Sequence, residues 1–158
     1  RDPIGCWKDP KFVELYMKTL PNLSVPVVHR AKVVDLTWRA LEGNIKYPKT
    51  IISEGSGPSL LYNTYEALRP FIEYFDLKVP VIFDRDISKP MLKEGNNPNQ
   101  ILGDMTGKKS KVSTKSFQMV DNASIALLKN PKEVKDTLLE SHRILKNEGF
   151  TKNLTFCV

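Results

Sequence analysis

The sequence predicts an α/β domain in three layers, with a mostly parallel sheet between two layers of helices. Short apolar, β-branched runs alternate with longer segments of helical periodicity along most of the chain. A glycine-rich loop follows the first of these runs. The chain has 158 residues, of which 41% are hydrophobic and 27% charged, as is typical of one globular domain. Strands that alternate with helices imply parallel pairing through helical crossovers.

The first part of the chain is predicted to be helical. Residues 10–20 have a helical apolar pattern, with Asp9 as the N-cap and Pro10 in the first turn. Residues 26–43 predict a second helix that Gly43 ends. We therefore expect residues 1–47 to form a helical cap or lid and residues 48–158 to form the domain with the sheet.

The second part alternates strands and helices. Strands are predicted over residues 49–54, 79–84, 100–104, 116–124 and 153–158. Helices are predicted over 59–75, with a break before Pro70, over 88–95, with Ser88 as the cap, and over 131–149, ending at Gly149. The buried side of the last helix is expected to carry Val134, Leu138, Leu139, Ile144 and Leu145. The expected strand order is 3-2-1-4-5, so the first strand is central.

The sequence stops at its predicted fifth strand, "NLTFCV". An apolar strand at the edge of a sheet promotes aggregation unless something covers it. We therefore expect the natural chain to continue beyond Val158.

The composition of the chain indicates where the protein is located and what kinds of partner it binds. No apolar run approaches the roughly 20 residues of a membrane-spanning helix. Cys6 and Cys157 stand near opposite ends and make neither a disulfide framework nor a zinc cluster, so a cytoplasmic location and no metal are expected. The net charge of +6 suits anionic partners, RNA included. The most basic run, "GKKSKVSTK" at residues 107–115, is interpreted as a solvated loop.

The glycine-rich loop, "IISEGSGPSLL", is the predicted ligand site. Ligands of parallel α/β sheets bind beyond the carboxyl ends of the strands, where this loop begins. A dinucleotide fingerprint would need a third glycine where Leu60 stands, which argues against a nicotinamide or flavin enzyme. Asp86 and Asp104 end the next strands and could accept from ribose hydroxyls and an adenine amino group. Either carboxylate alone is better explained as a helix cap or a solvated strand end, but their order after successive strand ends favours a ligand role.

Five segments in order resemble the motifs of class I S-adenosylmethionine-dependent methyltransferases, of the type that acts mostly on small molecules. They are "IISEGSGPSLL", "VIFDRDISKPMLK", "QILGDM", "SFQMVDNASIALL" and "EVKDTLLESHRILKNEGF". The resemblance covers about two thirds of the chain. It implies a Rossmann-like sheet, S-adenosyl-L-methionine as the cofactor and S-adenosyl-L-homocysteine as the product.

The resemblance also implies a set of cofactor-binding residues. Asp86 would hold the ribose, Ile87 would pack on the adenine, Asp104 would meet the adenine amino group and the Met105 backbone its ring. The full implied set is Glu54, Gly55, Ser56, Gly57, Asp86, Ile87, Asp104, Met105, Asp121 and Asn122. Within it, Gly55 and Gly57 would pass beside the methionine part, and Asp121 and Asn122 would face the sulfonium and the acceptor. Asp84 has no ligand contact in the motif.

The chain departs from the family pattern at two motif positions. Ser53 stands where an acid is usual, and Glu54 would reach the cofactor only through a one-residue bulge. Gln118 replaces the usual acid after Phe117. Methyl transfer needs a general base only where the acceptor loses a proton. His29 and Asp121 are weak candidates for that base, while the sequence favours a structural role for His142; Tyr16 is a further candidate.

The sequence therefore predicts transfer of a methyl group from S-adenosylmethionine to a small molecule. The fourth motif lacks the Pro-Pro-aromatic pattern of base-amine methyltransferases and the cysteine of cytosine-carbon methyltransferases. One alternative is a catalytically weak binding or scaffold protein of the same fold, with RNA as its partner. Another α/β nucleotide-binding enzyme is the third reading, which the absent glycine and phosphate-loop motifs oppose.

Overall fold

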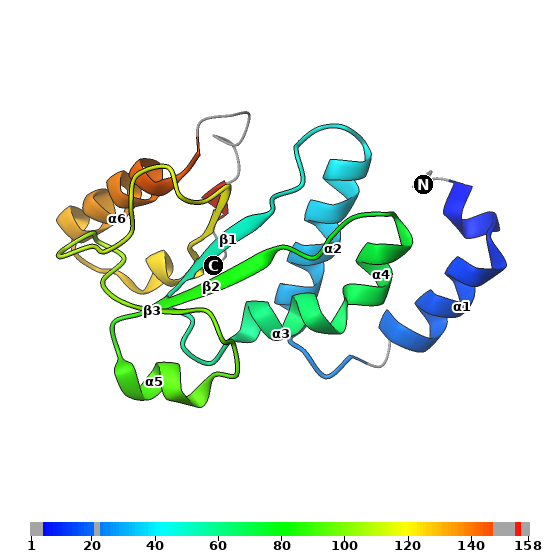
Figure 1. Ribbon diagram of the computed structural model, residues 1–158, viewed down its shortest axis with the longest axis horizontal. Coiled ribbons are helices and arrows are strands. Elements are labelled where there is room, and N and C mark those ends of the chain that lie inside the picture. Colours follow the sequence, from blue (N-terminus) through cyan, green and yellow to red (C-terminus); the bar gives the residue numbers. More distant parts are fainter. Residues whose placement is uncertain (1–4, 21–22, 147–153, 156–158) are drawn as a thin grey trace. The chain divides into compact units, whose positions relative to one another are not determined.

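A computed structural model of the protein describes residues 5–20, 23–146 and 154–155 (Figure 1). Its internal contacts divide the chain into two compact units. The helical unit comprises residues 1–49 and 60–80, and the sheet unit comprises residues 50–59 and 81–158. None of the described helices is long and apolar enough to cross a membrane.

The helical unit begins with a short 3-10 helix, η1 (Gly5–Lys8), followed by α1 (Pro10–Thr19) and α2 (Val27–Leu41). Asp9 caps α1 as predicted, since its carboxylate accepts a hydrogen bond of 3.0 Å from the backbone N–H of Lys11. The predicted helix over 59–75 is broken at Leu68 into α3 (Leu60–Ala67) and α4 (Arg69–Tyr74). Pro70 lies in the first turn of α4, where its missing N–H costs nothing.

Aromatic rings form the core of the helical unit. The ring of Phe12 is fully buried and lies 5.1 Å from that of Tyr74 and 5.7 Å from that of Phe75, centroid to centroid. Trp38 of α2 reaches the same cluster at 5.3 Å from Phe75. Such pairs contribute about 0.5–1.5 kcal/mol each beyond the area they bury, so they fix α1, α2 and α4 to one another.

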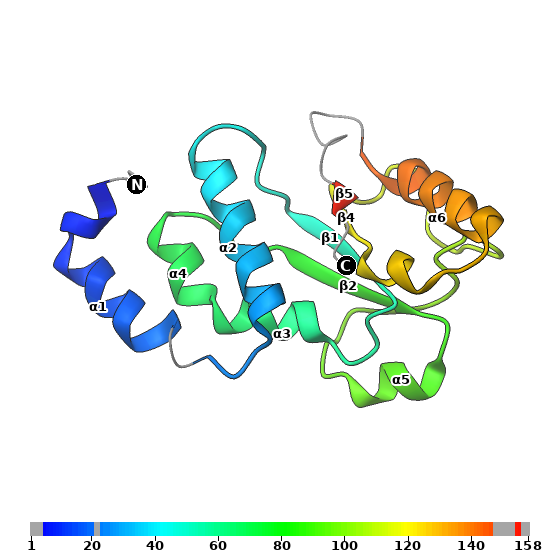
Figure 2. The same ribbon diagram turned by 180° about the vertical axis from the view of Figure 1, so that it is seen from behind.

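The sheet unit contains the predicted parallel sheet (Figure 2). Its strands are β1 (Thr50–Glu54), β2 (Val81–Asp86), β3 (Gln100–Leu102), β4 (Met119–Asp121) and β5 (Leu154–Thr155). Their order is β3-β2-β1-β4-β5, which confirms the expected order with β1 at the centre. In the β1–β2 register Glu54 lies opposite Arg85, and in the β1–β4 register Ser53 lies opposite Asp121.

The described part of the sheet unit also contains three helical segments: α5 (Lys89–Glu94), the 3-10 helix η3 (Ala123–Leu127) and α6 (Pro131–Ile144). Ser88 caps α5 as predicted, by accepting from the Met91 N–H at 3.3 Å. The predicted end of α6 was wrong. The helix stops at Ile144, because the backbone of Leu145 is extended and forms a parallel β-bridge with Phe117. Gly149 lies outside the described residues.

The predicted buried face of α6 was also wrong in part. Leu138 and Leu139 are exposed, and the residues that turn inward are Thr137, Glu140, Ser141 and Ile144. Polar residues take this face because Glu140 and Ser141 find partners inside the unit, as described below. Only the Ile144–Leu145 end of the predicted stripe reaches the apolar core, which also contains Ile52, Val112, Phe117 and Val120.

The connection from β3 to β4, residues 103–118, crosses the unit as a series of turns without a helix. Arg143 of α6 holds this connection in place. Its guanidinium donates to the Val112 carbonyl at 2.8 Å and to Ser110 Oγ at 3.0 Å, and its own carbonyl accepts from the Lys115 N–H at 3.1 Å. The irregular crossover is therefore anchored at several points along its length.

Candidate functional site

A cavity of about 230 Å³ lies at the carboxyl ends of β2 and β3, where the sheet topology places a ligand site. Five of the predicted site residues line it: Gly55, Asp86, Ile87, Asp104 and Met105. The other five do not: Glu54, Ser56, Gly57, Asp121 and Asn122. The remaining lining comes from residues that sequence reasoning missed: Arg85, Gly103, Thr106, Leu128 and Glu133.

Asp86, at the end of β2, ties two loops together. One carboxylate oxygen accepts from the Gly57 N–H at 3.0 Å and the other from the Ser88 N–H at 2.8 Å. The residue is only 8% exposed. Asp86 therefore borders the cavity while also holding the glycine-rich loop to the start of α5, a structural role that the sequence did not predict.

The other half of the cavity is formed by the residues that follow β3. Asp104 accepts from the Thr106 N–H at 2.9 Å, which fixes the turn. The hydroxyl of Thr106 is buried and has no hydrogen-bond partner among the described residues. Ile87 stands at the cavity although 73% of its surface is exposed. An apolar side chain and an unsatisfied hydroxyl beside a carboxylate are groups that a planar, polar-edged ligand could cover.

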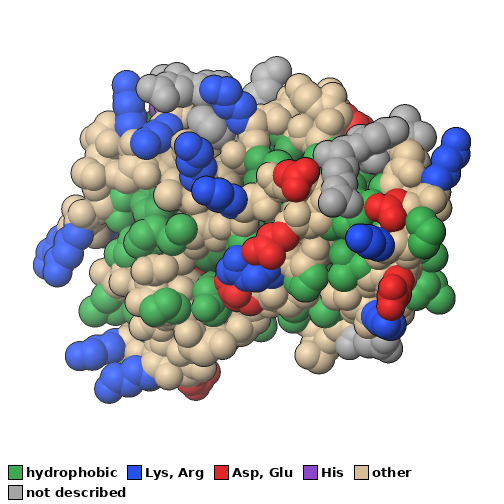
Figure 3. Space-filling model, turned by 45° about the vertical axis from the view of Figure 1, so that its right-hand side comes forward, with side chains coloured by type: hydrophobic (Ala, Val, Ile, Leu, Met, Phe, Trp, Pro, Cys, Tyr) green, Lys and Arg blue, Asp and Glu red, His purple; other side chains and the backbone are tan. Residues whose placement is uncertain are grey.

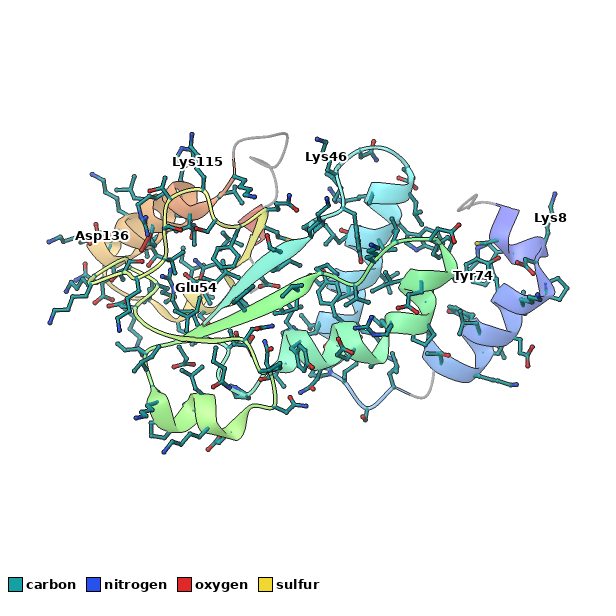
Figure 4. All side chains as sticks on the ribbon, viewed as in Figure 1. Lys8, Lys46, Glu54, Tyr74, Lys115 and Asp136 are labelled. Carbon is teal, nitrogen blue, oxygen red and sulfur yellow. The ribbon has the colours of Figure 1, made fainter. Side chains whose placement is uncertain are left out.

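Glu54 is committed to a buried ion pair. Arg85, its neighbour on β2, donates from Nε and from a terminal nitrogen to the two carboxylate oxygens of Glu54, at 2.7 and 2.6 Å (Figure 4 labels Glu54). Their side chains are 1% and 0% exposed, and a second carboxylate, Glu140, lies 3.9 Å from the guanidinium. Glu54 thus faces Arg85 rather than the cavity.

The charges of this pair depend on each other. Burial opposes the charge on Arg85, but the hydrogen bonds and charge of Glu54 outweigh it and raise the pKa of Arg85. Burial raises the pKa of Glu54, and Arg85 counters part of that rise. A bidentate arginine–carboxylate contact of this kind is strong only while both partners stay buried together.

The two glycines of the loop are required for close packing against other parts of the sheet unit. Gly55 has a φ of +63°, and a Cβ there would lie 2.2 Å from Ser124 Oγ. A Cβ on Gly57 would lie 2.7 Å from the backbone of Met91 in α5. Ser124 Oγ also donates to the Glu54 carbonyl at 2.9 Å, so η3 is fastened across the end of β1.

Asp84 occupies the interior next to this loop. It is fully buried and accepts from Ser56 Oγ at 3.1 Å. Burial raises the pKa of Asp84, and hydrogen bonds from Ser59, Asn97 and Ser56 offset part of the rise. The side chains of Asp84 and Ser56 therefore belong to the structure of the loop.

Asp121 and Asn122 lie at the end of β4 and are both buried. The Asn122 amide donates to Ser141 Oγ of α6 at 3.2 Å, which explains the inward turn of that part of α6. Of the candidate bases, His29 lies half-buried on α2 and Tyr16 half-buried on α1, while His142 is exposed on α6. Among the described residues no group of three or more His, Cys, Asp or Glu side chains is arranged to hold a metal ion.

Neither a known protein-family profile nor a curated protein sequence matches the chain. Several solved structures do match the chain in fold. The amino pentose methyltransferase CalS10 from Micromonospora echinaspora, involved in calicheamicin biosynthesis and solved with S-adenosylmethionine bound, superposes with a TM-score of 0.54 at 17% identity. That match covers 78% of this chain and 49% of CalS10.

The plantazolicin methyltransferase BpumL, solved with a pentazolic desmethylPZN analog and S-adenosylhomocysteine, superposes with a TM-score of 0.51 at 17% identity. That match covers 92% of this chain and 53% of BpumL. The chain thus spans about half the length of each of these structures. Together with the strand order and the position of the cavity, the matches show that the chain has the Rossmann-like fold of class I S-adenosylmethionine-dependent methyltransferases.

Proposed function

We propose that the protein binds S-adenosylmethionine and transfers its methyl group to a small-molecule acceptor. The observation that carries the proposal is the cavity at the ends of β2 and β3, which combines carboxylates with an exposed isoleucine in a methyltransferase fold. The five predicted site residues that line it are those to which the sequence motifs assign the nucleoside part of the cofactor and the first glycine of the loop.

The charge of the cavity supports this ligand over a phosphorylated nucleotide. Three carboxylates line it: Asp86, Asp104 and Glu133. Among the described residues that line it, the one cation is Arg85, which is paired with Glu54. A negatively charged site repels phosphate groups and attracts a ligand that carries positive charge, such as a sulfonium with an amino group.

The size of the cavity indicates which part of the cofactor it would hold. Sites for complete drug-sized ligands enclose roughly 300–1,000 Å³. A cavity of about 230 Å³ is better matched to the nucleoside portion alone. In this arrangement Asp86 would accept from the ribose hydroxyls with its remaining lone pairs, Asp104 from the adenine amino group, and Ile87 would pack on the base.

The cofactor supplies an already activated methyl group, so the chain has little covalent chemistry to perform. Its contribution is to align the reacting groups and to keep water away from them. The acceptor is proposed as a small molecule because the fold neighbours CalS10 and BpumL methylate an amino pentose and plantazolicin. His29 and Asp121 remain the candidate bases for an acceptor that must lose a proton.

Calorimetric titration with S-adenosylhomocysteine and with adenosine tests the proposal. Both ligands should bind, because the proposed contacts are to the nucleoside they share. Asp104→Asn keeps an oxygen for the Thr106 turn but removes the charge that faces the adenine amino group, so it should weaken both ligands by roughly five- to thirtyfold. Asp136→Asn on α6 removes the same charge from a residue that does not line the cavity, and it should leave both affinities unchanged. Absence of binding to the unaltered protein would reject the proposal.

A second candidate function is that of a catalytically weak binding or scaffold protein of this fold. The specific observation in its favour is that the first motif offers the cavity no acid: Ser53 replaces it and Glu54 is locked to Arg85. Incubation with S-adenosylmethionine carrying a labelled methyl group and a panel of small acceptors separates the two. Ligand binding without label transfer to any acceptor would favour the scaffold.

A further inference from the structure

A second cavity, of about 430 Å³, lies in the sheet unit beside the start of β3. The rings of Phe83 and Phe117 line it and meet edge to face at 5.3 Å. The rest of its apolar lining comes from Pro98, Ile101 and Val112. Its polar lining comes from Asn99, Gln100, Ser113, Ser116 and Lys111. None of the residues that line the first cavity lines this one.

One wall of this cavity is the basic run that the sequence analysis interpreted as a solvated loop. Residues 111–113, 116 and 117 line it, all within the irregular β3–β4 connection. Arg143 anchors that connection at Ser110, Val112 and Lys115, and Val112 is itself buried in the core. The wall is therefore a fixed part of the fold, and the cavity exists because a loop rather than a helix crosses the sheet there.

Within the part of the chain that the structure describes, the lysines around this wall have no acidic partners. On the sheet unit the exposed lysines are Lys89, Lys93, Lys108, Lys109, Lys111, Lys115, Lys129, Lys132 and Lys135. None of them forms an ion pair among the described residues. In the helical unit, by contrast, several surface cations pair with acids, as in Lys18–Glu14, Arg39–Asp35 and Arg69–Glu66.

Five of the nine acids that the structure describes in the sheet unit are buried inside it. Those that are buried are Glu54, Asp84, Asp86, Asp121 and Glu140. The outer charge of the sheet unit is therefore much more positive than its composition indicates. In Figure 3 several Lys and Arg side chains stand out from the surface without an acidic side chain beside them, and Figure 4 shows Lys115 pointing away from its loop.

We propose that the second cavity and the lysines of residues 107–115 bind a single-stranded nucleic acid, one base of which enters the cavity. Unpaired lysines attract a phosphate backbone, and the half-buried ring of Phe83, backed by the buried Phe117, offers a surface on which a base stacks. The side chain of Asn99 makes no hydrogen bond among the described residues and can both donate to and accept from a base edge. A base can enter only when it is not stacked in a duplex, which selects single strands. RNA and DNA share this chemistry.

Fluorescence anisotropy with labelled single-stranded 12-mers of RNA and DNA tests the proposal on the full chain without any cofactor, so the result does not depend on the proposed methyl transfer. Both single strands, or RNA alone, should bind, and a duplex of the same sequence should bind at least tenfold more weakly. The logarithm of the affinity should fall with the logarithm of salt concentration by about 0.7 for each phosphate contacted.

Two variants separate charge from cavity. The double variant Lys108→Gln/Lys111→Gln should lower affinity by roughly tenfold at low salt. The slope of log affinity against log salt concentration should become shallower by about 1, which corresponds to one to two phosphate contacts. The control Lys89→Gln/Lys93→Gln removes the same charge from α5 and should change affinity less than threefold. Asn99→Leu keeps the cavity apolar but removes the amide, and should lower affinity by about fivefold to tenfold with an unchanged salt slope.

Four results would overturn the proposal. They are no binding by the unaltered protein, equal binding of duplex and single strand, equal losses in the two lysine pairs, or unchanged affinity in Asn99→Leu. A fifth is displacement of the labelled strand by octanoate at concentrations where uridine monophosphate has no effect, because the cavity would then be a site for amphipathic anions. Melting curves of each variant should stay within a few degrees of the unaltered protein, which excludes loss of folding as the cause.

Discussion

Replacement of Asp86 by alanine should destabilise the fold as well as weaken the binding of the proposed cofactor. The carboxylate accepts from the Gly57 N–H at 3.0 Å and from the Ser88 N–H at 2.8 Å, and the residue is 8% exposed. The Gly57 N–H becomes a buried donor without an acceptor, which costs about 1–3 kcal/mol. The Ser88 N–H is partly accessible, so water replaces its lost bond at a cost of about 1 kcal/mol or less.

Together these losses amount to about 1–4 kcal/mol in the free energy of unfolding. Urea denaturation followed by circular dichroism measures this difference directly. Asp136→Ala on α6 is the matched control, because Asp136 makes no hydrogen bond or ion pair among the described residues, and it should change stability by less than about 0.5 kcal/mol. A loss below about 0.5 kcal/mol for Asp86→Ala as well would show that Asp86 does not hold the two loops.

The same variant should bind S-adenosylhomocysteine about thirty- to a thousandfold more weakly, since charge-assisted hydrogen bonds to a ribose contribute roughly 1.5–3 kcal/mol each. Binding must be measured without urea, at a temperature where the variant is fully folded. Unchanged affinity in a folded variant would remove Asp86 from the proposed site and leave it a purely structural residue.

Three further changes test the interior of the sheet unit. Glu54→Gln leaves the buried charge of Arg85 without its main partner and should cost about 3–5 kcal/mol in urea denaturation, whereas a loss under about 1 kcal/mol would show that Glu140 compensates. Gly57→Ala places a Cβ 2.7 Å from the Met91 backbone and should lower the melting temperature by several degrees; an unchanged melting curve would show that α5 shifts freely. Because burial raises the pKa of Asp84, the folded state holds its proton more tightly than the unfolded state does. Stability should therefore fall as pH rises from the ordinary value of 3.8 through the raised pKa, and Asp84→Asn should abolish that fall; identical pH profiles would contradict the assignment.

The strands and their order could be predicted from sequence because their signals are local. β1 and β2 each contain a short apolar run, and Ser88 caps α5 through an interaction within four residues. The alternation of strand and helix then leaves few topologies for a parallel sheet. Those predictions needed no knowledge of which side chains meet.

The side-chain partners inside the sheet unit could not be predicted, because they join residues far apart in the chain. Nothing in "ISEG" or "FDRD" indicates that Glu54 and Arg85 pair rather than face solvent, and the pair becomes evident only in the β1–β2 register. The inward face of α6 was mispredicted for the same reason, since Ser141 turns inward to meet Asn122. Thr106 and Glu133 lacked a motif that would have placed them at the cavity.

The pairing of Glu54 with Arg85 has a consequence for how such a protein can evolve. Either residue changed alone leaves a buried charge whose cost of about 3–5 kcal/mol is comparable to the whole stability of many small domains. A lineage that carries the pair can exchange it for two apolar residues only by passing through a poorly folded intermediate, or by changing both at once. The two positions, 31 residues apart in sequence, are therefore expected to change together in related proteins.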